Sequence, residues 1–228
     1  MNTSNFLLRG LDWFGTYSDI IGLTIIFITL LFTYQSLRCS LKSWILFFYS
    51  LFWISTLITT ISNFLHLTNN WMYNSMPFLL SIPLCFFFSS SHDSRILRRF
   101  NVVFIVSFVL VAIVFWKQIF IKNFNPIFYL TFSFYILINS VGYLYEEMTT
   151  MRSDNLFKKT EFWFVSCLFF YATICVITWS LFSYLEDNIA AQNRFLHPGT
   201  LWMYGHNNIL FIQSLVFSTA IFKTASKK

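Results

Sequence analysis

Seven apolar stretches, each about as long as a membrane-spanning helix, cover most of this 228-residue chain. A helix needs roughly 20 apolar residues to cross about 30 Å of hydrocarbon, and a helix satisfies all of its backbone hydrogen bonds internally there. The sequence therefore predicts an all-α membrane protein, a bundle of seven transmembrane helices. The expected spans are Tyr17–Leu37, Trp44–His66, Trp71–Phe88, Asn101–Trp116, Pro126–Tyr145, Phe162–Leu185 and Leu201–Phe222.

The composition agrees with a chain that lies mostly in lipid. Hydrophobic residues make up 57% and charged residues 11%, whereas a soluble domain is about half apolar and a quarter charged. The short connections leave no room for a soluble domain, so we expect one transmembrane domain over residues 1–228. The start of the chain, 1–6, lacks the basic region of a signal peptide, and no small-residue cleavage pattern precedes the second span. Residues 1–16 precede the first expected span. We expect them to form an interfacial segment, and residues 223–228 to form a short basic tail.

The lysines and arginines fall overwhelmingly in alternate connections, which predicts the orientation. One side holds four, namely Arg9, Lys117, Lys122 and Arg194, and the other holds eleven, namely Arg38, Lys42, Arg95, Arg98, Arg99, Arg152, Lys158, Lys159, Lys223, Lys227 and Lys228. The richer side is cytoplasmic by the positive-inside rule, so we expect the N-terminus outside and the C-terminus inside. Cations dispersed among short loops indicate contact with the lipid bilayer and no nucleic-acid partner.

Polar side chains gather at the expected outer ends of three spans. Asn63 and His66 share a helical face in the second span because they are three residues apart. Gln213 follows His206 by seven residues, hence lies on nearly the same face one layer deeper. The candidate ligand-binding residues are Asn63, His66, Asn74, Trp202, His206, Asn207 and Gln213.

Two interpretations of this polar layer stay open. Its side chains either form hydrogen bonds that hold neighbouring helices together or line a pocket that opens to the outside. We expect no cofactor and no metal, because His66 and His206 are the only histidines within spans, fewer than a haem core with paired histidines at two levels needs. The chain contains no catalytic motif that predicts an enzyme, and no mid-span carboxylate that predicts a proton-coupled pump.

The opposite side of the membrane carries a candidate surface for a cytoplasmic partner. The longest inner connection, 148–160, holds Arg152, Lys158 and Lys159. The alternative for these basic residues is contact with anionic lipid. His92, in another inner turn, is expected to be an ordinary loop residue.

The last third of the chain resembles a known kind of membrane module. Glu161-Phe162-Trp163 with Tyr171 downstream, and then Leu201-Trp202 followed by His206-Asn207-Asn208-Ile209, are similar to seven-helix modules of some bacterial proteins. Those modules often precede a cytoplasmic histidine-kinase domain. The resemblance implies a sensor or membrane anchor in the bacterial inner membrane, and because no kinase follows here, a stand-alone module that signals to a separate protein. The alternatives are a structural subunit of a larger membrane complex and a small-molecule transporter.

Overall fold

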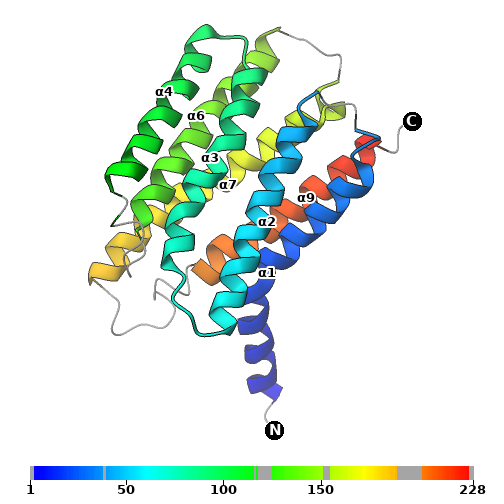
Figure 1. Cartoon of the computed structure of the whole chain (residues 1–228). Coiled ribbons are helices and arrows are strands. Elements are labelled where there is room, and N and C mark those ends of the chain that lie inside the picture. Colours follow the sequence, from blue (N-terminus) through cyan, green and yellow to red (C-terminus); the bar gives the residue numbers. More distant parts are fainter. Residues whose placement is uncertain are drawn as a thin grey trace.

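The computed structural model contains seven helices that are each long and apolar enough to cross a membrane. It describes residues 3–37, 40–115, 117, 125–150, 155–188 and 202–225, and no strand occurs among them. The helices are α1 (Thr3–Thr33), α2 (Lys42–Phe64), α3 (Asn70–Ser91), α4 (Arg95–Val114), α6 (Pro126–Thr150), α7 (Thr160–Asn188) and α9 (Asn208–Ala225), with the 3-10 turn η1 (Leu156–Lys158) and the π-helical turn η3 (Trp202–Asn207) (Figure 1). The prediction of seven membrane-length helices is confirmed.

Successive helices run in opposite directions, so the bundle has two ends, and the two termini lie at opposite ones (Figure 1). We call one the His66 end, after the turn 65–69 between α2 and α3, and the other the His92 end, after the turn 92–94 between α3 and α4. The basic residues that the sequence assigned to one side of the membrane share the His92 end wherever the structure describes them: Lys42, Arg95, Arg98, Arg99, Lys158, Lys159 and Lys223.

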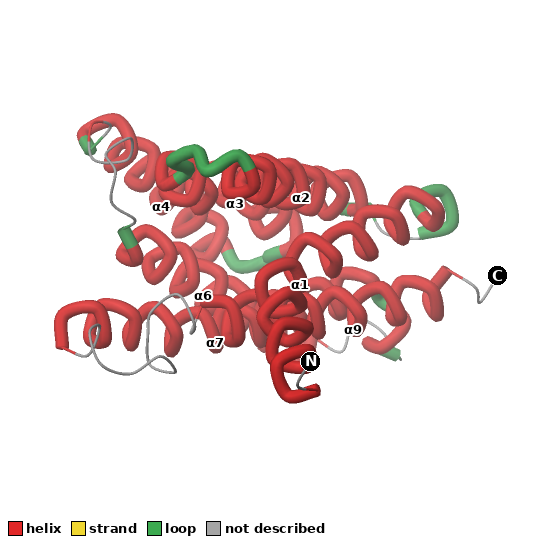
Figure 2. The backbone as a smooth tube through the Cα atoms, turned by 90° about the horizontal axis from the view of Figure 1, so that it is seen from below, coloured by secondary structure: helices red, strands yellow, loops and turns green. Residues whose placement is uncertain are grey.

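Six of the helices form a closed ring, and α4 lies outside it. Helix α1 packs against α2 and α9, α7 packs against α6 and α9, and α3 joins α2 to α6. Viewed from the His66 end, α2, α3 and α4 form one row, with α6, α7 and α9 beneath it (Figure 2). Only 11% of the span of α4 is buried, which makes it the peripheral helix.

Aromatic side chains fill the half of the ring toward the His92 end. Phe164 of α7 contacts Phe48 of α2 at a ring distance of 5.7 Å and Phe87 of α3 at 4.8 Å. Tyr49 stacks on Phe217 of α9 at 5.5 Å. All five side chains are buried. Offset and edge-to-face pairs of this kind stabilise a core beyond the apolar area that they bury, so this half of the bundle is tightly closed.

Several helix ends differ from the expected boundaries. Helix α4 begins at Arg95, six residues before the predicted Asn101, because the Ser94 hydroxyl caps it by accepting a hydrogen bond from the backbone nitrogen of Leu97 at 3.4 Å. Helix α1 begins at Thr3 and runs unbroken into its span. The proposed interfacial segment is therefore helical from Thr3 onward, and its place at the interface stays a prediction.

Candidate functional site

A vestibule of about 430 Å³ opens at the His66 end, with walls from α1, α2, α3 and η3. Small-molecule sites in proteins are commonly 300 to 1,000 Å³. Three of the predicted site residues, Asn63, His66 and Asn207, line it together. The described residues that line it are Thr16, Tyr17, Asp19, Thr60, Asn63, Phe64, His66, Tyr73 and Asn207.

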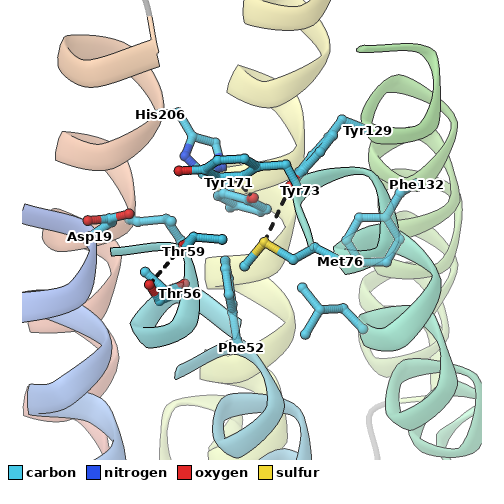
Figure 3. A pocket seen from close by; sticks show the side chains of 12 residues that line it. Asp19, Phe52, Thr56, Thr59, Tyr73, Met76, Tyr129, Phe132, Tyr171 and His206 are labelled. Carbon is cyan, nitrogen blue, oxygen red and sulfur yellow. Dashed lines mark hydrogen bonds between the residues drawn. The ribbon is translucent and has the colours of Figure 1, made fainter. Parts of the chain in front are cut away.

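A second, smaller cavity lies deeper in the bundle and shares a wall with the vestibule. Asp19 and Tyr73 line both spaces, and His206 and Tyr171 lie in the deeper one (Figure 3). Its volume is about 10 Å³, which is room for roughly one water molecule. Of these two spaces, the vestibule is the one with room for a molecule larger than water.

A buried chain of hydrogen bonds joins α7, η3 and α1 beside these cavities. The amide nitrogen of Asn207 donates to the Gly15 carbonyl at 3.1 Å, so its Oδ1 faces His206 Nδ1 at 3.3 Å and accepts from it. His206 Nε2 then accepts from the Tyr171 hydroxyl at 2.8 Å. This order assigns His206 a proton on Nδ1 and leaves Nε2 as the acceptor.

The π-helical turn η3 presents neighbouring residues to different helices. His206 reaches α7 through Tyr171, Asn207 reaches α1 through Gly15, and Asn208, the first residue of α9, accepts from the Ser18 hydroxyl of α1 at 3.0 Å. Single π-helical turns inside helical segments are frequent at functional sites. These hydrogen bonds tie η3 and the start of α9 to both α1 and α7.

The α2–α3 wall combines a face of α2 with the turn that follows it. Asn69 donates to the Asn63 side chain at 2.8 Å and to the Thr59 carbonyl at 3.2 Å. Asn63 in turn donates to the Tyr73 hydroxyl at 3.5 Å. His66 lies beyond the end of α2 at Phe64, is exposed, and has a left-handed backbone with φ of 53°. His66 therefore reaches the mouth of the vestibule through the turn after α2, and not through the helical face that the sequence predicted.

Asp19 is the site residue that the sequence analysis missed. It lies six residues beyond Trp13, where the span of α1 begins, and it is half-buried. Its Oδ1 accepts from the backbone nitrogen of Ile20 at 2.7 Å. The expected start of the first span at Tyr17 placed Asp19 at the membrane edge, away from the span centre where a carboxylate was expected to mark function. The signal was present, because an ionisable residue inside any span indicates function.

Of the other three candidate ligand-binding residues, two line neither cavity, and the side chain of the third lies outside the described residues. Asn74 is buried, and its Oδ1 accepts from the backbone nitrogen of Asn125 at 2.9 Å, which holds the start of α6 against α3. Gln213 is buried within α9 and lines neither cavity. The side chain of Trp202 lies outside the described part.

The candidate partner-contact residues lie at the His92 end where they are described. The ammonium group of Lys159 forms an ion pair with Glu147 at 2.6 Å, which ties the segment around η1 to α6. Lys158 is exposed, and Arg152 lies outside the described residues. Their contact with a partner stays a prediction.

No family model, curated protein or solved structure matches the chain. The resemblance to the membrane modules of histidine kinases therefore stays a prediction. The described residues contain no group of three or more histidine, cysteine or acidic side chains placed to hold a metal ion. The fold itself defines the class, a helical protein with the seven membrane-length helices of an integral membrane protein.

Proposed function

We propose that this chain is a stand-alone sensor-like or accessory membrane protein that binds a small ligand in the vestibule and passes the bound state to a cytoplasmic partner. The observation that carries the proposal is the double role of Asn207. It lines the vestibule and also makes the hydrogen bond that holds η3 to α1. A ligand that displaces this side chain changes the packing of the ring.

Coupling requires two arrangements of the bundle with different affinities for the ligand. The helices joined by the hydrogen bonds around η3 supply a route, because α1, α7 and α9 each run from the His66 end to the His92 end (Figure 1). Helix α7 follows directly after η1, where Lys158 is exposed and Lys159 is paired with Glu147. A shift of α7 at its Tyr171 contact would thus move the basic segment that we assign to the partner.

The closed aromatic core favours a binding module over a transporter. The vestibule adjoins the small cavity beneath Asp19 and Tyr73, and the rings of Phe48, Phe164 and Phe217 pack the bundle beyond it. A transport path would require these buried rings to separate.

The alternating basic residues support an outward-facing vestibule, since the His92 end carries the charge expected of the cytoplasmic side.

Occupying the vestibule covalently tests the proposal without knowledge of the natural ligand. In a Cys39→Ser background, Asn63→Cys places a thiol on the vestibule wall, and N-ethylmaleimide adds a small group there. We expect hydrogen–deuterium exchange in the 155–159 segment to change at least twofold when the adduct forms. Adding Asn207→Leu removes the η3–α1 hydrogen bond and is expected to weaken that response.

The matched control is Leu67→Cys, an exposed position at the same end that does not line the vestibule. Its adduct is expected to leave exchange at 155–159 unchanged. Equal exchange with and without the adduct at position 63 would contradict the proposed coupling between the two ends.

A further inference from the structure

Asp19 places a carboxylate inside the span of α1 without a basic partner there. No ion pair joins it to any lysine, arginine or histidine of the residues that the structure describes. Its Oδ1 accepts a hydrogen bond at 2.7 Å from the neighbouring backbone nitrogen of Ile20. A carboxylate withdrawn from water is costly unless it meets an opposite charge, and such residues within membranes commonly mark ligand or ion sites.

The side chains around Asp19 are suited to binding a cation. The rings of Tyr17, Phe64 and Tyr73 line the same vestibule, and aromatic faces attract ammonium groups, most strongly where water is excluded. The described lining residues include no lysine and no arginine, and the one titratable basic side chain among them is His66, on the exposed turn at the mouth. An anionic ligand would meet the Asp19 carboxylate with no fixed positive charge among the described lining residues to offset it.

We infer that the vestibule binds a small organic ammonium ion, with Asp19 as its counter-ion and the tyrosine rings around its charged head. The sizes of the two spaces set the orientation. The deeper cavity of about 10 Å³ admits no ligand body, so the ammonium group lies at the Asp19–Tyr73 wall and the remainder fills the vestibule of about 430 Å³ toward the mouth. This inference rests on the proposed function of the vestibule as a ligand site and specifies the class of ligand.

Choline and its uncharged isostere 3,3-dimethyl-1-butanol form a matched pair of probes, because they differ in charge and hardly in shape. Binding to the full chain is measured by isothermal titration calorimetry in maltoside micelles, which carry no ammonium group. Choline is expected to bind at least tenfold more tightly than the alcohol. Asp19→Asn, which removes the charge and keeps the shape, is expected to weaken choline binding at least tenfold and to leave the alcohol unaffected.

Two further variants make the result specific. Asp93→Asn makes the same chemical change at the His92 end and is expected to retain choline binding. Asp19→Glu keeps the charge and is expected to bind choline within about tenfold of the natural chain, so it tests the inference even where Asp19→Asn folds poorly. Equal binding of both probes, no choline binding, or full choline binding by Asp19→Asn would each overturn the inference. The maleimide-adduct experiment uses no cation, so the ligand class and the proposed coupling can fail separately.

Discussion

At the scale of single residues, His92 shows how a residue in a turn can hold two helices together. Its ring is buried, with Nδ1 at 3.1 Å from Glu146 Oε2 and Nε2 at 3.2 Å from Asn139 Oδ1. The Asn139 nitrogen donates to the Tyr135 carbonyl, so its oxygen faces the histidine. Both ring nitrogens thus face polar atoms of α6, which holds the turn 92–94 against that helix. The expectation of an ordinary loop residue was wrong, because the turn 92–94 folds inward against α6.

Glu146 and Glu147 are adjacent, and they give a matched test of this cluster. Glu146 also accepts backbone hydrogen bonds from Asp93 and Ser94, at 3.2 and 2.9 Å. Glu146→Gln removes the charge opposite a buried ring and is expected to lower the free energy of unfolding by about 3 kcal/mol. Glu147→Gln breaks the partly exposed pair with Lys159 and is expected to cost about 1 kcal/mol. Equilibrium unfolding in mixed micelles with SDS measures both, and equal losses would contradict this account of His92.

At the scale of elements, α1 and α9 approach closely because α1 carries a glycine at their contact. A Cβ atom built on Gly22 would lie 2.9 Å from the backbone Cα of Phe211 and 2.9 Å from Ser214 Oγ. Real Cβ atoms are not found so near a backbone atom, so a larger side chain must separate the two helices. Small residues at such crossings are the usual means by which membrane helices pack closely.

Gly22→Ala is therefore expected to destabilise the bundle by about 1 to 3 kcal/mol, the usual cost of overpacking. Gly205 supplies the control, because a Cβ atom there would first meet Thr178 Oγ1 at 3.7 Å, an ordinary contact distance. Gly205→Ala is expected to change the free energy of unfolding by less than about 0.5 kcal/mol, because the added methyl group meets no crowded contact there. Thermal unfolding followed by tryptophan fluorescence distinguishes the two, and an equal effect would show that the α1–α9 contact relaxes freely.

The elements also show what hydropathy can and cannot predict. All seven helices were predictable because about 20 consecutive apolar residues have few other folds. Their ends were less so, since the start of α4 depends on a hydrogen bond from Leu97 to Ser94 and the end of α2 on the turn around His66. The direction in which a polar side chain points depends on its neighbours. Asn74 was expected at the ligand site, yet it holds the backbone of Asn125.

At the scale of the whole molecule, the first and last helices complete the site. Ser18 and Asn208 are 190 residues apart in the chain and form a hydrogen bond of 3.0 Å. A hydropathy pattern carries no information on which helices become neighbours, so the polar residues of the second, third and seventh spans were grouped without the first. The ring closure of α1 on α9 brings Asp19 to the vestibule and makes α1 its fourth wall.

The orientation of the whole bundle decides whether the vestibule faces outside. In a Cys39→Ser background, the other three cysteines are buried, so single exposed thiols report the side that they occupy. Leu67→Cys lies in the turn at the His66 end and Phe157→Cys in η1 at the His92 end, where the native side chains are 59% and 66% exposed. Because the basic residues gather at the His92 end, the positive-inside rule predicts that a membrane-impermeant maleimide labels position 67 in intact cells. Position 157 is expected to react only after permeabilisation. The reverse pattern would place the vestibule on the cytoplasmic side, where Asp19 would meet ligands from within the cell.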